Sequence, residues 1–286
     1  MVAAHEARLH VATSVDDAVA VLTEAGGDAV PMAGATWLMR AELRDEPIRP
    51  LYVALGRIEA LKGVEIAADA VSIGACVTHA ELAGGLAGLP EMRGLAQAAG
   101  HAATPAVRAV ATVGGNLAAS GFAAADLAPA LLAADAEVEV AGSNGTERLP
   151  LAGYLATRDQ AAAGSLIVRV IVPRGDCVSA HTRLPLRVAG DYPVAIVSMN
   201  VAVSPDGTIA DLRIGVGSVE PVAARWTALE EALASQPLDP EAAATAAREH
   251  AGVFAPRDGV EASGAYRVRV LPALVRRAIE ALAASR

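Results

Sequence analysis

The stretch ATVGGNLAASGFAAADLAP, from Ala111 to Pro129, is the part of this sequence from which its fold and function are best approached. It places a pair of glycines, Gly114 and Gly115, after three residues compatible with a β-strand and before a run of small side chains. Paired glycines allow a positive φ and a close approach by a ligand, because no Cβ stands in the way, and their amides can form a nest for an anion. The alternative is a tight glycine turn between two buried elements.

The charges around this stretch limit how it could hold an anion. No lysine or arginine lies between Ala109 and Asp135, and the lone carboxylate after the glycines is Asp126. A phosphate bound here would therefore be held by N–H groups rather than by a cationic side chain. The Gly-Lys-Ser/Thr ending of a Walker-type loop is also absent.

A second loop of small residues follows a short strand predicted at residues 28–32. The sequence AGAT at residues 33–36 ends in a hydroxyl and precedes a helix that we expect to begin near Trp37. A loop that opens a helix offers free N–H groups and the positive end of the helix dipole to an anion. Two such loops in one chain suit a ligand with two phosphates.

Length and composition restrict the class of protein. A chain of 286 residues suits two domains, or one large domain with an appendage, and 53% apolar residues permit a sizeable core. The net charge of −9 argues against nucleic acid as the main partner, because counterion release needs a basic face. No apolar run approaches the ~18 residues of a membrane span, and the N-terminus shows no apolar signal core. We therefore expect a cytoplasmic protein.

The cysteines exclude several kinds of metal centre. Cys76 and Cys177 are single and far apart, so they cannot supply the ligands of an iron–sulfur cluster or a structural zinc site, and no metal ligand is predicted. Gly215-Val-Gly217 lacks the third glycine of a dinucleotide fingerprint, which argues against a Rossmann domain.

The other patterns predict an α+β chain with a linker at residues 173–176. Ser14 is expected to cap a helix with Asp17 at its third position, and Thr78 to cap another. Beyond the linker, a hairpin around Asp206-Gly207 with helices on one side predicts a second α+β domain. The other predicted strands are residues 51–54, 64–66, 70–75, 137–140, 165–172, 192–203 and 209–216, and the other predicted helices are 91–103, 127–133, 221–234, 241–250 and 266–284.

An ordered set of motifs resembles the FAD-binding (medium) subunit of the molybdenum hydroxylases, the group of xanthine and carbon monoxide dehydrogenases. The motifs span nearly the whole chain, in the order and spacing typical of that family. They are AGAT at 33–36, LGRIEALKG at 55–63, IGACVTHAEL at 73–82, ATVGGNL at 111–117, and Tyr266-Arg267 followed by RRA at 276–278.

The resemblance implies a two-lobed FAD-binding domain of the vanillyl-alcohol-oxidase (PCMH) type at residues 1–175, with lobes at about 1–55 and 56–175. Residues 176–286 would form the smaller α+β C-terminal domain. The family's first loop has a second glycine where this chain has Ala35, which is compatible only with a negative φ or a ligand slightly farther away. The residues implied at the FAD pyrophosphate are Met32, Ala33, Gly34, Ala35, Thr36, Trp37 and Leu38.

The resemblance assigns further cofactor contacts. The second loop would place Thr112, Gly114, Gly115 and Asn116 on the pyrophosphate and ribityl chain, and Asp126 resembles a sugar-binding aspartate. Leu166 matches a strand position that packs on the flavin, and Arg183 matches a cation near the isoalloxazine, where it would favour the anionic reduced ring. Tyr192 matches a side chain over the flavin in some relatives; the alternative is an ordinary strand tyrosine.

The function implied is electron relay. FAD in this chain would receive electrons from 2Fe-2S clusters in a small subunit, which obtain them from a molybdopterin cofactor in a large subunit. It would pass them to an external acceptor such as NAD⁺, O₂ or a quinone, in a heterotrimer or its dimer. The protein would supply orientation and electrostatics, so no residue is expected to be a catalytic acid or base. The small, uncharged residues 118–124, with Phe122 among them, are expected either to dock a partner or to pack on the domain's own helices.

Two other functional classes remain open. One is a stand-alone flavin oxidase or reductase, which requires turnover by the single chain and an acid or base that the sequence does not reveal. The other is an assembly protein that has lost FAD, for which Ala35 is the main argument. A flavin absorbance spectrum separates the second from the rest.

Overall fold

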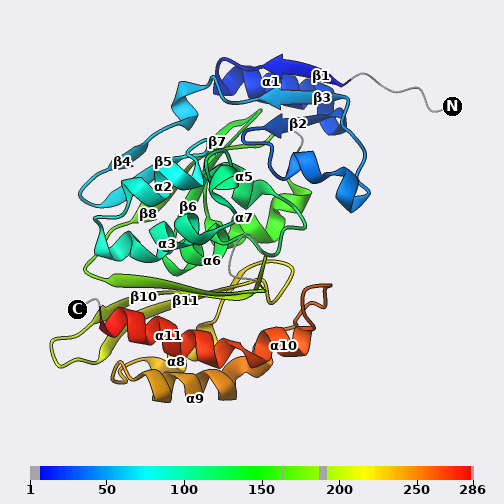
Figure 1. The fold of residues 1–286 in the computed structure, drawn as a ribbon. Coiled ribbons are helices and arrows are strands. Elements are labelled where there is room, and N and C mark those ends of the chain that lie inside the picture. The colour runs from blue at the N-terminus through cyan, green and yellow to red at the C-terminus, as the bar shows by residue number, and fades with distance from the viewer. Residues whose placement is uncertain (1–6, 163, 187–191, 285–286) are drawn as a thin grey trace.

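The protein is described by a computed structural model over residues 7–162, 164–186 and 192–284. Within these ranges the strands form three β-sheets. Figure 1 shows them one below another: a small N-terminal sheet, a middle layer of sheet and helices, and a C-terminal sheet above the last helices. Helices pack against sheets that are mostly antiparallel, so the predicted α+β class is confirmed.

The N-terminal sheet is small and parallel. Its strands are β1 (Arg8–Val11), β2 (Ala29–Met32) and β3 (Leu51–Ala54), in the order β1-β3-β2. Helix α1 (Val15–Ala25) connects β1 to β2, as a crossover between parallel strands requires. The predicted cap is present, because the Ser14 side chain accepts a hydrogen bond from the Asp17 amide. Instead of the helix predicted near Trp37, two 3₁₀ turns follow β2, at Leu38–Arg40 and Glu42–Arg44.

The middle sheet is antiparallel and has five strands in the order β4-β5-β8-β6-β7. Strands β5 and β8 pair with each other, and the long segment of chain between them carries the helices of this layer. Thr78 forms the predicted capping box with Glu81. The strands are β4 (Val64–Ile66), β5 (Ala70–Gly74), β6 (Glu137–Gly142), β7 (Gly145–Pro150) and β8 (Leu166–Pro173), and the helices are α2 (His79–Gly85), α3 (Arg93–His101), α4 (Pro105–Arg108), α5 (Val113–Ala118), α6 (Leu127–Ala133) and α7 (Leu151–Thr157).

The C-terminal sheet is covered on both faces. Helices α8, α9 and α11 lie on one side and α3 and α6 of the middle layer on the other, so the first nine residues of β10 are all buried. The predicted hairpin with the helices that follow it on one side is therefore present, and the cover on the other face comes from α3 and α6, which periodicity does not reveal. The strands are β9 (Val178–Pro185), β10 (Pro193–Val203), β11 (Ile209–Gly217) and β12 (Ala224–Arg225), and the helices are α8 (Thr227–Leu233), α9 (Pro240–His250), α10 (Gly264–Arg269) and α11 (Leu271–Ala283).

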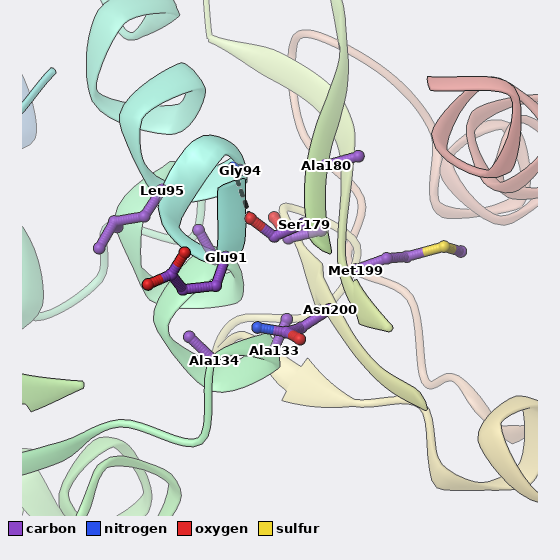
Figure 2. Close-up of a pocket in the computed structure, with 11 residues that line it drawn as sticks. Glu91, Gly94, Leu95, Ala133, Ala134, Ser179, Ala180, Met199 and Asn200 are labelled. Carbon is purple, nitrogen blue, oxygen red and sulfur yellow. Dashed lines mark hydrogen bonds between the residues drawn. The ribbon is translucent and has the colours of Figure 1, made fainter. Parts of the chain in front are cut away.

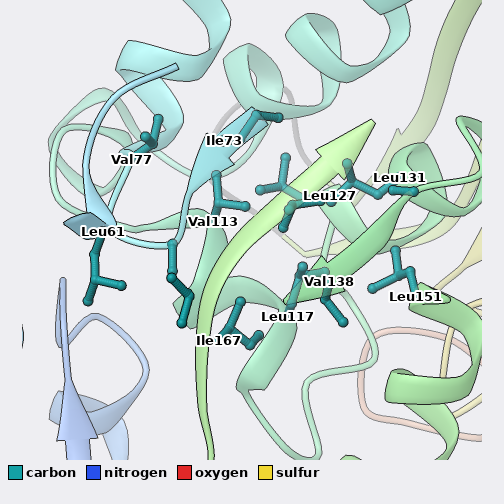
Figure 3. Packing of buried hydrophobic residues seen from close by; sticks show 14 of the residues in the cluster. Leu61, Ile73, Val77, Val113, Leu117, Leu127, Leu131, Val138, Leu151 and Ile167 are labelled. Carbon is teal, nitrogen blue, oxygen red and sulfur yellow. The ribbon is translucent and has the colours of Figure 1, made fainter. Parts of the chain in front are cut away.

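The core of the middle layer supports the glycine-rich stretch. Figure 3 shows Val113 and Leu117 of α5 beside Leu127 of α6 and Ile167 of β8. All four side chains are buried, the first three completely. Truncating such a residue typically costs about 2–5 kcal/mol, so the first turn of α5 rests on a rigid base.

Candidate functional site

A cavity of about 770 Å³ lies between the loop after β2, the first turn of α5, Arg183 of β9 and Tyr192, the residue before β10. Its size falls within the range of about 300–1,000 Å³ that is typical of small-molecule sites. Of the residues predicted to bind a cofactor, only Met32 does not line it. Those that do are Ala33, Gly34, Ala35, Thr36, Trp37, Leu38, Thr112, Gly114, Gly115, Asn116, Asp126, Leu166, Arg183 and Tyr192.

The loop after β2 presents a row of backbone donors. Among the described residues, the amides of residues 34–38 donate no hydrogen bond to another protein group. Ala35 has a φ of +56°, so it is left-handed, and the Trp37 backbone that follows is right-handed. Consecutive amides that have no protein partner can bind an anion together. Because φ at Ala35 is positive, the first of the two conditions stated for this residue is not met, and a ligand slightly farther away is the condition that remains.

Gly34 is required by packing rather than by its own dihedral angles. A Cβ added at this position would lie 1.8 Å from the Val110 carbonyl oxygen. No side chain fits there unless the backbone moves. The loop after β2 is therefore held against the segment that leads into α5.

The glycine pair of the central stretch has a different role from the predicted one. Thr112 caps α5, so Gly114 and Gly115 lie in its first turn and not in a positive-φ loop. The Gly114 amide donates to the Ala75 carbonyl at 2.8 Å and the Gly115 amide to the Thr112 hydroxyl at 3.2 Å. An added Cβ at Gly114 would lie 2.8 Å from the Ala75 Cβ. The predicted anion nest is thus absent from this turn, whose amides already have partners.

Arginine side chains give the cavity a positive charge. The ionisable groups of fixed charge that line it are Arg40, Arg44, Arg49 and Arg183 against Glu46 and Asp126, four cations less two anions, or +2. The whole chain carries −9. Arg44 makes paired hydrogen bonds of 2.7 and 2.6 Å to the Glu46 carboxylate, which raise the pKa of Arg44 and lower that of Glu46. A dianionic ligand would neutralise this excess.

Asp126 and Arg183 form a buried ion pair. The Arg183 Nε lies 2.8 Å from the Asp126 Oδ1, and the Asp126 residue is only 5% exposed. The His181 Nε2 lies 3.6 Å from the same oxygen. The resemblance assigned Asp126 to the sugar and Arg183 to the ring of a cofactor, whereas the structure joins both residues, with His181 beside them, into one polar unit at the cavity wall.

Three aromatic rings, Trp37, Phe122 and Tyr192, form one side of the cavity, which we call the aromatic wall. The centroids of Trp37 and Phe122 are 4.6 Å apart, and those of Phe122 and Tyr192 are 5.5 Å apart. Arg40 Nη1 donates to the Tyr192 hydroxyl at 2.5 Å. Phe122 is half-buried and packs against the core of the middle layer as well as on the other two rings, which agrees with the second placement predicted for it, packing on the domain's own elements.

His79 and Cys76 line the cavity as neutral groups. Burial lowers the pKa of His79 to about 4, and neither ring nitrogen has a hydrogen-bond partner among the described residues. Burial raises the pKa of the Cys76 thiol to about 11. Because the thiolate is the nucleophilic form, Cys76 is unreactive near neutral pH.

Two sequence families match the chain in succession. The FAD binding domain in molybdopterin dehydrogenase matches residues 5–175, and the CO dehydrogenase flavoprotein C-terminal domain matches residues 181–282. The chain belongs to the FAD-binding medium subunits of the molybdenum hydroxylases. The resemblance found in the sequence motifs is therefore confirmed.

Relatives with curated names or solved structures agree with this family. The alpha subunit of the 6-hydroxypseudooxynicotine dehydrogenase complex of Paenarthrobacter nicotinovorans is 30% identical, over 94% of this chain and 92% of that protein. CO dehydrogenase from Oligotropha carboxidovorans is 27% identical with a TM-score of 0.88, over 98% of this chain and 99% of that one. A CO dehydrogenase from Hydrogenophaga pseudoflava is 27% identical with a TM-score of 0.87, over 98% of both chains. The chain is thus an oxidoreductase flavoprotein subunit.

The cavity has the features that the family's FAD requires. FAD carries two phosphates, and the cavity offers five amides without protein partners and a net charge of +2. The cationic residues at 40–49 and the ring of Phe122 were missed from the sequence. An arginine at every fourth or fifth position, Arg40, Arg44 and Arg49, was a signal that could have identified them.

Three further observations delimit the site. A second cavity of about 10 Å³, shown in Figure 2, lies where Gly94 of α3 faces Ser179 of the C-terminal sheet, and it has room for about one water molecule. In the described part of the chain, no cluster of histidine, cysteine, aspartate or glutamate could hold a metal ion. No helix of the described residues is both long and apolar enough to cross a bilayer.

Proposed function

We propose that this FAD-binding subunit transfers electrons from the iron–sulfur clusters of a partner subunit to an external acceptor. The observation that supports this most strongly is the row of backbone amides at residues 34–38, which opens into a cavity with a net charge of +2. Such a row stabilises a pyrophosphate through charge-assisted hydrogen bonds.

The contacts with the cofactor are proposed as follows. The amides of residues 34–38 bind the pyrophosphate, and the positive cavity charge supplements them. The side chains of Thr112, Asn116 and Asp126 face the ribityl and ribose hydroxyls, with Asp126 as an acceptor. Leu166 and the aromatic wall contact the ring. Met32 positions the loop from outside the cavity.

The protein's own residues hold the ring and set its surroundings. Bound FAD supplies the redox chemistry, which needs no acid or base from the protein. The Arg183 guanidinium, oriented by Asp126 at 2.8 Å, places a fixed positive charge at the cavity wall. A cation near the ring favours its anionic reduced form. FAD is proposed to be held without a covalent bond, because neither the loop at residues 33–38 nor the stretch at residues 111–117 contains a histidine or a cysteine.

The partners follow from the family. We propose an iron–sulfur small subunit and a molybdopterin large subunit, assembled as a heterotrimer or its dimer in the cytoplasm. The 6-hydroxypseudooxynicotine dehydrogenase relative is named as a subunit of a complex, which supports assembly. Residues 1–175 and 176–286 are proposed as the FAD-binding and C-terminal domains, of which residues 1–6, 163, 187–191 and 285–286 lie outside the described ranges.

Reduction of the chain with and without its partners tests this function. Purified alone, the chain should carry one FAD, and the organic substrate of the complex should not bleach the flavin absorbance. Addition of the iron–sulfur and molybdopterin subunits should restore substrate-dependent bleaching. Turnover by the isolated chain would instead identify a stand-alone oxidase or reductase, and a colourless chain that cannot be reconstituted with FAD would identify an assembly protein.

A further inference from the structure

A buried polar cluster in the C-terminal part of the chain lies directly behind the aromatic wall. It consists of Ser218, Arg257, Glu261 and Arg267, and we call it the Ser218 cluster. The Ser218 and Arg267 residues are both 0% exposed. A fully buried guanidinium is unfavourable unless its donors are satisfied, so the contacts of Arg267 indicate what the cluster holds in place.

The cluster binds the chain immediately after Tyr192. The Ser218 hydroxyl donates to the Pro193 carbonyl at 2.6 Å, and Arg267 Nη1 donates to the Val194 carbonyl at 2.8 Å. These two carbonyls belong to the first residues of β10. The backbone that carries the Tyr192 ring is therefore fixed by two hydrogen bonds from the cluster.

The same serine also binds the chain immediately after Phe122. The Ser218 amide donates to the Ala123 carbonyl at 3.0 Å. Ser218 has a φ of +64°, a conformation that L residues other than glycine seldom adopt. The side chain is nevertheless a serine, whose hydroxyl bonds to Pro193 while its amide bonds to Ala123. One residue thus connects the two segments that present Phe122 and Tyr192.

The rest of the cluster holds Ser218 itself. Arg257 Nε donates to the Ser218 carbonyl and Nη2 to its hydroxyl, both at 3.1 Å. Arg267 Nη1 lies 3.2 Å from each of the same two oxygens. The Glu261 carboxylate lies 3.1 Å from Arg267 and 3.9 Å from Arg257, so it neutralises part of their charge.

We infer that the Ser218 cluster is a positioning device that sets the separation of Phe122 and Tyr192, and through it the surface on which the flavin ring stacks. This inference rests on the proposed function, because it takes the ring to lie at the aromatic wall. None of the residues of the cluster lines the cavity, so Ser218 and Arg267 are positioning residues and not catalytic ones. It gives the C-terminal domain a specific role in the site beyond covering the FAD-binding domain.

Ser218→Ala tests the inference, since it removes the hydroxyl but keeps the Cβ, so that the strain of the positive φ stays the same. Ser235→Ala is the matched control: Ser235 also has a positive φ, +61°, but is exposed and binds only the Ile209 carbonyl through its amide. If Ser218→Ala does not fold, Arg257→Lys keeps the charge and removes donors from the cluster. Thermal unfolding is measured first to select folded proteins.

The first readout uses the protein without FAD. The chain has two tryptophans, and Trp226 is 0% exposed while Trp37 stacks on Phe122. Acrylamide quenching therefore reports Trp37. We expect Ser218→Ala to raise the quenching constant toward that of an exposed tryptophan, while Ser235→Ala leaves it at the wild-type value. Unchanged quenching in folded Ser218→Ala would overturn the inference.

The second readout uses bound FAD. Aromatic stacking quenches flavin fluorescence, so the loosened wall should make bound FAD brighter and raise its Kd about fivefold, the equivalent of one ordinary hydrogen bond. Increased Trp37 quenching with unchanged flavin emission and Kd would also overturn the inference, because the positioned wall would then not face the ring. Failure of the wild-type protein to bind FAD at all would instead refute the proposed function, while the acrylamide result would stand.

Discussion

Ala35→Gly should stabilise this protein, although Ala→Gly substitutions usually destabilise. Ala35 adopts a φ of +56° in the loop that we propose for the pyrophosphate. A left-handed conformation costs an L residue about 1–2 kcal/mol, and glycine adopts it without that cost. Against this gain stands the greater entropy of glycine in the unfolded chain, about 0.4–1 kcal/mol. The balance is a net stabilisation of about 0.5–1 kcal/mol.

Thermal and urea unfolding of the protein without FAD measure this difference. For a chain of this size, about 1 kcal/mol corresponds to a rise in Tm of about 2–4 °C. Ala242→Gly is the matched control, because Ala242 is exposed on α9 and helical, so the same exchange should cost about 0.5–1 kcal/mol there. Opposite signs at the two positions are expected. A lower Tm for Ala35→Gly, or a tenfold loss of FAD affinity, would refute the left-handed assignment.

Three further substitutions test the site. Gly34→Ala should lower the free energy of unfolding by about 1–3 kcal/mol and weaken FAD binding, because the new Cβ would lie 1.8 Å from the Val110 carbonyl oxygen. A variant with an unchanged urea midpoint and an unchanged Kd for FAD would contradict this packing. Asp126→Asn should lower the free energy of unfolding of the protein without FAD by about 3–5 kcal/mol, since Arg183 would lose the carboxylate of its ion pair. A variant in which only the FAD affinity changes would show that the pair contributes no stability. The pKa of His79 is lowered to about 4, so between pH 6.5 and 4 only the unfolded chain takes up the proton. The free energy of unfolding should therefore fall by about 3 kcal/mol as the pH drops through that range. His79→Gln should flatten this part of the pH profile, and an equally steep profile in the variant would show that other groups cause the pH dependence.

The elements that follow local rules were predictable from the sequence. The caps at Ser14 and Thr78 depend on side chains that bind amides three residues away, and both are present. The hairpin of β4 and β5 and the turn at Asp206-Gly207 also depend on neighbouring residues. Such features need no knowledge of the rest of the chain.

Features that depend on distant contacts were not predictable. The glycine pair predicted a positive-φ nest. Instead, a side chain at Gly114 has no room because Ala75, nearly 40 residues earlier, packs against this position. Conversely, the residue of the loop after β2 that has a positive φ is Ala35, and an alanine in a sequence does not predict a positive φ. The pairing of Asp126 with Arg183 and the aromatic wall likewise join residues from separate layers. Family motifs located the cavity, but only coordinates show which groups supply its donors.

The most direct test of the central claim is an equilibrium titration of the protein without FAD, using FAD and riboflavin in parallel. If the amides of residues 34–38 bind the pyrophosphate, removal of the phosphates loses at least two charge-assisted hydrogen bonds of about 1.5–3 kcal/mol each. FAD should therefore bind one to one and at least about 100-fold more tightly than riboflavin. Equal affinities for the two flavins would contradict the account.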